Sequence, residues 1–194
     1  MALFEVERKR RLPSVTEAAA LTDRLLELGH HQRAQHTETD TYYSRPDVDY
    51  LTTVECLRVR QRGSFAEITY KPASTTDTHR AGDMIVKQET NVLLADARQA
   101  NAARQLLAAV GMIEVAVVEK TRTAYTNPQR DQITVALDTI TNLGTFVEVE
   151  ITATDSDQAA VLLAEVEAAL GITGYPVVAL PYRDLVRQDE GVTT

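Results

Sequence analysis

Hydrophobic and polar residues alternate along much of the chain. This alternation predicts β-strands, because successive side chains of a strand point to opposite faces. Eight segments show it, separated by residues that favour turns: 3–11, 35–45, 54–62, 65–71, 85–93, 114–125, 132–138 and 145–152. Three further segments have helical periodicity and are rich in Ala and Leu: 14–28, 96–111 and 155–171. The pattern predicts an α+β protein in which strands dominate and helices lie between groups of strands.

Polar residues at the start of each helical segment support this assignment. Ser14 and Glu17 have the spacing of a capping box, in which each residue satisfies a free backbone N–H of the other. Asp96 and Asp155 belong to the residue types that cap helix N-termini. We therefore expect the second and third helices to begin at these two aspartates.

Charged residues gather on one face of each predicted strand. On the first strand Glu5, Glu7 and Lys9 share a face, because residues two apart point the same way. The corresponding positions on later strands hold Arg58, Arg60, Arg62, Lys71, Lys87, Lys120, Arg122, Asp138, Glu148 and Glu150. Each such face could simply be solvated, as on one side of an ordinary antiparallel sheet. The sorting by sign favours another arrangement, since carboxylates collect on the first and last strands and cations on those between.

Three apolar helices need a sheet surface to cover, which favours packing against the apolar face of the strands. If the sheet also closes, the fold is a closed eight-stranded antiparallel β-barrel with helices packed on the outside, and the charged face lines its interior. Such a lining is too costly to bury without counter-charges. Because Lys and Arg bind polyanions and carboxylates bind divalent cations, the lining predicts a metal-bound polyphosphate inside the barrel.

Composition narrows the class of protein. The 194 residues suit a single domain, which we place at 1–188, with a short C-terminal tail at 189–194. Cys56 is the only cysteine, so a disulfide framework is excluded. A net charge of −8 argues against nucleic-acid binding, and we find neither a signal peptide nor an apolar run that could span a bilayer. We expect a cytoplasmic protein with no nucleic-acid or membrane partner; a homodimer through exposed strand edges stays an open alternative.

The order of the charged motifs resembles a known superfamily. Glu5, Glu7 and Lys9 match the N-terminal Glu-x-Glu-x-Lys signature of the CYTH proteins, or triphosphate tunnel metalloenzymes. This superfamily includes class IV adenylyl cyclases, thiamine triphosphatases and inorganic triphosphatases. Further matching motifs follow in order: DTYY at 40–43, LRVR at 57–60, ITYKP at 68–72, EKTR at 119–122, LD at 137–138, LGTFVEVE at 143–150 and PYRDLV at 181–186. The resemblance covers nearly the whole chain.

The resemblance implies roles for individual residues. Lys9 is the candidate catalytic residue, which would orient or deprotonate the nucleophile. The candidate ligands for Mg²⁺ or Mn²⁺ are Glu5, Glu7, Asp138, Glu148 and Glu150, with orientation of a cation as the alternative role of Asp138. The candidate phosphate-binding residues are Arg58, Arg60, Lys71, Lys87, Lys120 and Arg122. The chain departs from the family at 87–91, where Lys-x-Glu-x-Asn replaces the frequent Arg-x-Glu-x-Glu, so Glu89 could instead pair with a neighbouring cation.

The implied substrate is a small-molecule triphosphate such as ATP, inorganic triphosphate or thiamine triphosphate. Hydrolysis of the triphosphate is the first hypothesis. The alternatives are a class IV adenylyl cyclase, which converts ATP to cyclic AMP and pyrophosphate, and a non-catalytic polyphosphate or nucleotide sensor. Hydrolysis and cyclisation both depend on positioning and on stabilisation of negative charge, so the charged lining alone does not separate them.

Other charged residues are expected outside the site. We assign Arg8, Arg10 and Arg11 to a solvated strand edge, with a place at the tunnel mouth as the alternative. Arg62 is expected in solvent beside the turn that follows it, and the four histidines and Cys56 in surface or packing roles.

Overall fold

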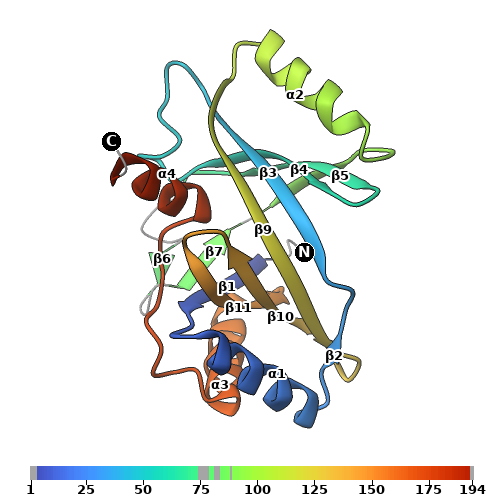
Figure 1. Ribbon diagram of the computed structural model, residues 1–194, viewed down its shortest axis with the longest axis vertical. Helices are drawn as coiled ribbons and strands as arrows, with labels where there is room; N and C mark the ends of the chain where they lie inside the picture. Colours follow the sequence, from blue (N-terminus) through green and yellow to red (C-terminus); the bar gives the residue numbers. More distant parts are fainter. Residues whose placement is uncertain (1–3, 74–78, 81–83, 88, 193–194) are drawn as a thin grey trace.

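The computed structural model describes residues 4–73, 79–80, 84–87 and 89–192 (Figure 1). The strands are β1 (Phe4–Arg11), β2 (His31–Gln32), β3 (His36–Ser44), β4 (Cys56–Arg62), β5 (Phe65–Lys71), β6 (His79–Arg80), β7 (Met84–Lys87), β8 (Thr90–Leu93), β9 (Ile113–Asn127), β10 (Arg130–Ile140) and β11 (Gly144–Ala153). The helices are α1 (Val15–Glu27), α2 (Gln99–Ala109), α3 (Ser156–Leu170) and α4 (Tyr182–Val192). The α+β class and the three predicted helices are confirmed.

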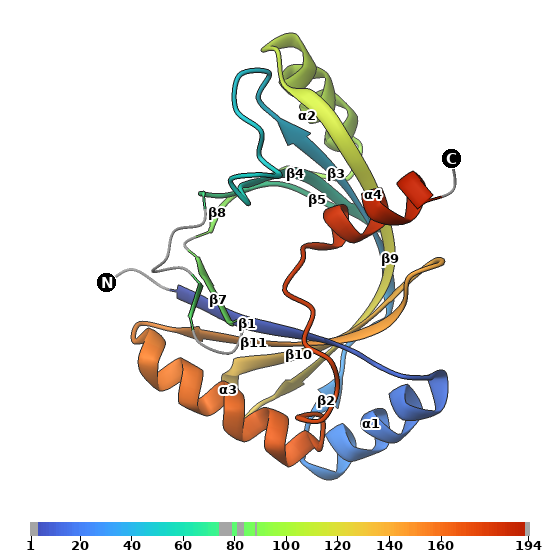
Figure 2. The same ribbon diagram turned by 90° about the vertical axis from the view of Figure 1, so that its left-hand side faces the viewer.

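The strands form one antiparallel sheet with the order β6-β7-β1-β11-β10-β9-β3-β4-β5-β8, and β2 pairs with β9. The sheet curls around a central space, with α1 and α3 on its outer side beneath β1, β10 and β11 (Figure 2). The strands therefore present one face to the helices and the other to the space inside the curl.

The prediction of a closed barrel is wrong, because the sheet is open across the part of the chain that the structure describes. The single strand expected over 85–93 is divided into two strands: β7, which lies next to the end strand β6, and β8, which is the strand at the opposite end of the sheet. Its first part, β7, pairs with β1, whereas its second part, β8, pairs with β5. Because β7 pairs on the β1 side and β8 on the β5 side, no single strand among the described residues joins β1 to β5, and the sheet does not close into a barrel.

The apolar core lies between the sheet and its outer helices. Val6, Val149 and Ile151 of β1 and β11 are fully buried, and Leu25 of α1 and Leu163 of α3 pack against the same cluster. Burial of such side chains contributes roughly 1.5–3 kcal/mol each. This packing fixes the apolar face of β1 and β11 outward and turns their charged face inward.

The helix ends follow the sequence signals in two of three cases. The Ser14 hydroxyl accepts a hydrogen bond from the backbone N–H of Glu17, and Asp155 caps α3. The expected start of α2 at Asp96 is wrong: the helix begins at Gln99, and Asp96 instead accepts from the backbone N–H of Arg98 in the preceding turn. The carboxylate stabilises this turn rather than the first turn of the helix.

Arg8 and Arg10 do not lie on a solvated edge, so that expectation is wrong. β1 lies between β7 and β11, and α3 covers its outer face. Arg10 donates to the Glu167 carboxylate through Nε at 2.7 Å and Nη2 at 2.9 Å, and Arg8 donates to the same carboxylate at 2.6 Å. A buried carboxylate on α3 therefore pairs with both arginines and ties the helix to β1.

The segment between α3 and α4 passes one end of the curled sheet. Its backbone bonds to β1, with the N–H of Val178 donating to the Lys9 carbonyl at 2.8 Å and the N–H of Arg11 donating to the Pro176 carbonyl at 3.0 Å. It leads into α4, a helix that the sequence analysis did not predict. This helix continues to Val192, so it extends into the segment 189–194 that was expected to be a short C-terminal tail. No helix among the described residues is long and apolar enough to cross a membrane.

Candidate functional site

The inward faces of the strands surround a cavity of about 180 Å³, here called the charged cavity. Its charged lining consists of Glu5, Glu7, Lys9, Glu55, Arg58, Arg60, Lys71, Glu89, Lys120, Arg122, Glu148, Glu150 and Arg183. Except for Glu55, Glu89 and Arg183, these side chains come from strands far apart in the sequence, and the alternation along each strand directs them inward. The structure thus brings together the predicted site residues apart from Lys87 and Asp138. Lys87 lies opposite Glu5 in the β1–β7 register, and its side chain falls outside the part that the structure describes.

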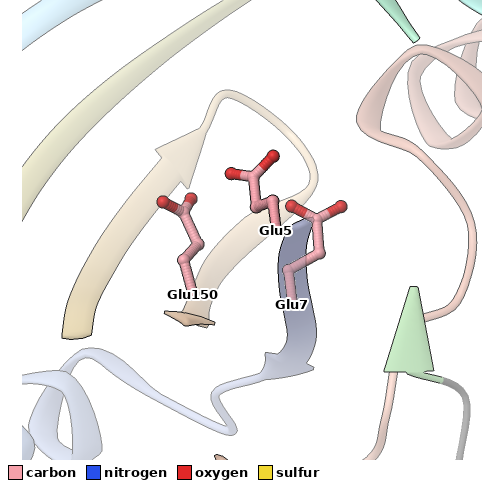
Figure 3. A group of neighbouring side chains, drawn as sticks. All are labelled: Glu5, Glu7 and Glu150. Carbon is pink, nitrogen blue, oxygen red and sulfur yellow. The ribbon is translucent and has the colours of Figure 1, made fainter. Parts of the chain in front are cut away.

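Three carboxylates form a compact cluster on one wall of this cavity. Glu5, Glu7 and Glu150 each offer an oxygen, and these oxygens all lie within 4.8 Å of one another (Figure 3). Glu7 and Glu150 are directly opposite in the β1–β11 register. Oxygen ligands at this spacing suit a hard divalent cation such as Mg²⁺. We call these three residues the carboxylate cluster.

Two members of the carboxylate cluster, Glu5 and Glu150, have raised pKa values. Burial raises the pKa of Glu5 to about 7, with the Lys71 ammonium opposing and the Glu7 carboxylate adding to the rise. Burial also raises the pKa of Glu150 well above its usual value; the Arg122 guanidinium opposes this, and the Glu148 carboxylate adds to it. Like charges crowded in a buried site disfavour ionisation, and a bound divalent cation would relieve that repulsion. The residues present therefore fit such an ion.

Arg122 connects the carboxylates with the cations. Its Nη2 lies 3.3 Å from Glu148 and its Nη1 lies 3.3 Å from Glu150. Burial alone would raise the pKa of Glu148, but Arg122 and the neighbouring lysines hold it well below its usual value. The pKa values of the two β11 carboxylates are therefore shifted in opposite directions, down for Glu148 and up for Glu150.

Asp138 lies behind Arg122, fully buried, and is not among the described residues that line the charged cavity. It accepts from Nε and Nη2 of Arg122 at 2.7 and 2.6 Å. The Lys120 ammonium lies 3.5 Å from the same carboxylate. The resemblance implies that Asp138 either binds the metal or orients a cation. Its position behind Arg122 matches the second role.

Two buried carboxylates on β3 were not assigned a role from the sequence. Asp40 accepts from Nε and Nη2 of Arg60 at 2.7 and 2.8 Å. Glu38 lies 3.3 Å from both the Arg60 guanidinium and the Lys120 ammonium. Burial opposes ionisation of Glu38, but Arg60 and Lys120 lower its pKa to about 2. The alternation along β3 places Glu38 and Asp40 on one face, and the sequence shows this. The sequence does not show that this face meets the cations of β4 and β9.

Lys71 links the two ends of the open sheet. It projects from β5, and its ammonium lies 2.8 Å from Glu5 on β1 and 2.9 Å from Glu89, just before β8. Glu89 thus pairs with a cation. Burial opposes its ionisation, but Lys71 and Arg58 lower its pKa to about 2. Ion pairs therefore bridge the gap that backbone pairing leaves open. Arg62 is half-buried and lies 3.4 Å from Glu38, so it is less solvated than expected.

Lys9 has a distinct environment at the end of the cavity where α4 begins. Its ammonium donates to the Leu180 carbonyl at 2.7 Å and lies 4.1 Å from the centre of the Tyr182 ring. Burial lowers the pKa of Lys9, with the Glu148 and Glu7 carboxylates opposing. Burial likewise lowers the pKa of Lys120, and the Arg122 guanidinium adds to this effect. Both of these lysines therefore lose a proton more readily than an exposed lysine does.

A match to the CYTH domain model covers residues 3–179, so the chain belongs to the CYTH domain family. Among characterised sequences it is similar to "Putative adenylate cyclase MJ0240" of Methanocaldococcus jannaschii, with 24% identity over 186 residues, 94% of this chain and 98% of that protein. The family assignment agrees with the resemblance found in the sequence motifs.

Solved structures share the fold. The PH1819 protein from Pyrococcus horikoshii OT3 has a TM-score of 0.78 and 23% identity, covering 95% of this chain and 99% of that one. HpAC1 from Hippeastrum, described as a "putative adenylyl cyclase" with a dominant triphosphatase activity, has a TM-score of 0.65 and 17% identity, covering 96% of each chain. At these identities the likeness shows a common fold.

Proposed function

We propose that this protein is a divalent-metal-dependent enzyme that hydrolyses a triphosphate bound in the charged cavity. The observation that carries the proposal is the placement of the carboxylate cluster and the cations of β4, β5 and β9 around one buried space. A cation site beside several phosphate-binding side chains is the arrangement that a metal–triphosphate complex requires.

Glu5, Glu7 and Glu150 would hold Mg²⁺ or Mn²⁺, with Glu148 beside them on β11. When bound, such an ion neutralises charge on phosphate oxygens and makes the phosphorus more electrophilic. Glu5 and Glu150, whose pKa values are raised, would release protons more readily when the cation binds.

The cations of the opposite wall would bind the phosphate oxygens. Arg58, Arg60 and Arg122 offer planar guanidinium groups for paired hydrogen bonds, and Lys71 and Lys120 act as point charges. Lys87 is proposed as a further member of this set. The carboxylates behind Arg60 and Arg122 hold these guanidinium planes in fixed orientations before substrate arrives. Such preorganisation stabilises the charge that develops during phosphoryl transfer.

Lys9 would orient the attacking water and accept its proton. The lowered pKa makes the neutral amine of Lys9 more accessible than that of an ordinary lysine, and the Leu180 carbonyl accepts one of its N–H groups. The lone pair of the amine is then directed by two fixed contacts, the Leu180 carbonyl and the Tyr182 ring. A base held in this way contributes typically 10²–10⁴-fold to a rate.

Adenylyl cyclisation is the second candidate, favoured by the name of the Methanocaldococcus jannaschii relative. The name of the Hippeastrum structure, which describes a dominant triphosphatase activity, supports hydrolysis. The reactions differ in the atom attacked: water attacks a terminal phosphorus in hydrolysis, whereas the ribose 3′-hydroxyl attacks the α-phosphorus in cyclisation.

Product analysis by mass spectrometry separates these reactions. The pure protein is incubated with inorganic triphosphate, ATP or thiamine triphosphate, each with Mg²⁺ or Mn²⁺ and each with chelator. We expect metal-dependent release of orthophosphate. Cyclic AMP with pyrophosphate would establish the cyclase instead, and binding without any product would establish a sensor.

A further inference from the structure

We propose that Arg183 is a positioning residue that sets the size of substrate the charged cavity accepts. It holds one opening of the cavity narrow, so that inorganic triphosphate is preferred over nucleoside triphosphates. This inference rests on the proposed function and adds to it the substrate class and the residue that determines it.

Arg183 is an almost completely buried arginine, 1% exposed, in the first turn of α4. It donates to the Tyr50 carbonyl through Nη2 at 2.7 Å and to the Glu55 carbonyl through Nη1. Its Nε donates to Asp184 at 3.0 Å. A buried guanidinium bonded to two backbone carbonyls of another segment fixes that segment relative to α4.

Both segments that Arg183 joins line the charged cavity. Val54, Glu55 and Cys56 lie on one side, and Pro181 and Tyr182 lie on the other. We call these two segments, 54–56 and 181–183, the mouth. Their distance from each other sets how wide this part of the cavity is.

Each side of the mouth is held by further contacts. The Glu55 carboxylate accepts from the Tyr70 hydroxyl and from the Thr53 hydroxyl, both at 2.7 Å. Val54 has a φ of 55°, a conformation that a β-branched residue adopts only when its surroundings impose it. On the opposite side the Leu180 carbonyl and the Tyr182 ring both contact Lys9. These contacts hold both segments of the mouth in fixed positions.

The size and chemistry of the cavity point to a compact ligand. Its volume of about 180 Å³ lies below the roughly 300–1,000 Å³ of pockets that enclose drug-sized molecules. Its uncharged lining among the described residues is confined to Tyr42, Val54, Cys56, Pro181 and Tyr182. The rest of the described lining is charged, with cations for phosphate and carboxylates for a metal, so only these five uncharged residues are left to contact a base and a ribose.

The test compares kcat/KM for inorganic triphosphate with kcat/KM for ATP in wild type and in Arg183→Met. Methionine keeps much of the apolar volume and removes both backbone contacts of the arginine. We expect wild type to prefer inorganic triphosphate and the variant to shift the ratio toward ATP by at least about tenfold. A ratio within about twofold of wild type in a folded variant would overturn the proposal.

Val54→Gly gives a second route to the same answer if Arg183→Met does not fold. Glycine adopts a positive φ without strain, so the variant keeps the backbone of the loop while removing a side chain from the mouth. We expect the same shift toward ATP. Arg187→Met is the matched control, because Arg187 is an exposed arginine on the same helix and should leave the ratio unchanged.

The outcomes distinguish this inference from the proposed function. If wild type turns over none of the triphosphates, the proposed function fails. If wild type hydrolyses inorganic triphosphate but Val54→Gly and folded Arg183→Met keep its ratio, the proposal about the mouth fails alone. An equal shift in Arg187→Met would also overturn it, because the effect would then not come from the mouth.

Discussion

Arg122 donates to both oxygens of the Asp138 carboxylate, through Nε at 2.7 Å and Nη2 at 2.6 Å, and the same guanidinium lies 3.3 Å from both Glu148 and Glu150. One arginine therefore joins a buried carboxylate behind the wall to the carboxylates at the cavity surface. Asp138 therefore holds Arg122 in place, whereas Glu148 and Glu150 lie at the cavity surface where a metal would bind.

Asp138→Asn tests that distinction. We expect KM for triphosphate to rise at least about tenfold, because Arg122 loses its charged, bidentate partner, while the Mg²⁺ concentration needed for half-maximal rate stays close to wild type. Steady-state kinetics over a Mg²⁺ series measures both quantities. An altered Mg²⁺ requirement with unchanged KM would instead make Asp138 a metal ligand.

Glu148→Gln is expected to lose most activity, at least about 100-fold, while folding normally. Glu148 lies beside the proposed metal site and keeps its negative charge next to Arg122. The assay is metal-dependent phosphate release, with circular dichroism to check folding. Glu119→Gln, an exposed position on β9, is the control. Near wild-type rates in Glu148→Gln would contradict the assignment of this residue to the metal site.

Lys9→Met is expected to lower kcat by about 10²–10⁴-fold and to change substrate affinity much less, because Lys9 is placed to accept a proton from the nucleophile. Rates and binding of inorganic triphosphate to the variant are measured separately, with calorimetry for the binding. An effect confined to affinity would remove Lys9 from the chemistry.

The acid stability of the fold should depend on Glu38. Its pKa is about 2 in the folded state against an ordinary value of 4.5. Ionised Glu38 thus stabilises the fold above pH 4.5 by about 3 kcal/mol, and this contribution is lost as pH falls toward 2. Glu38→Gln should lower the free energy of unfolding at pH 7 by a similar amount, and the difference from wild type should shrink below pH 4.5. Urea denaturation at pH 7 and pH 3 measures it; a difference independent of pH would contradict the charge pairing.

Glu167→Gln should destabilise the fold by roughly 3 kcal/mol or more, because it leaves the buried Arg8 and Arg10 without a counter-charge. Glu165→Gln, at an exposed position of the same helix, should change the free energy of unfolding by less than about 0.5 kcal/mol. Denaturant titration compares the two. Equal effects would show that the buried pairs contribute nothing specific.

The sequence was sufficient to predict most of the strand side chains that face the charged cavity, because strand alternation is a local property. Glu5, Glu7 and Lys9 needed only a spacing of two residues to be placed on one face. The apolar face opposite them had to pack under helices, and α1 and α3 cover it.

What depends on pairing between distant segments could not be predicted in the same way. Glu167 pairs with Arg8 and Arg10 only because α3 packs against β1, and periodicity within either segment carries no information about that packing. The division of the strand at 85–93 depends on which neighbour each half pairs with. Arg183 was missed for a similar reason, since its partners are backbone carbonyls that any residue offers.

The most direct test of the account is phosphate release from inorganic triphosphate in Mg²⁺, after addition of excess chelator, and again after Mg²⁺ is restored. The account predicts release in Mg²⁺, loss of release with chelator and recovery on restoration. Release that continues undiminished in chelator, or no release in any condition, would contradict a metal-dependent triphosphatase in this cavity.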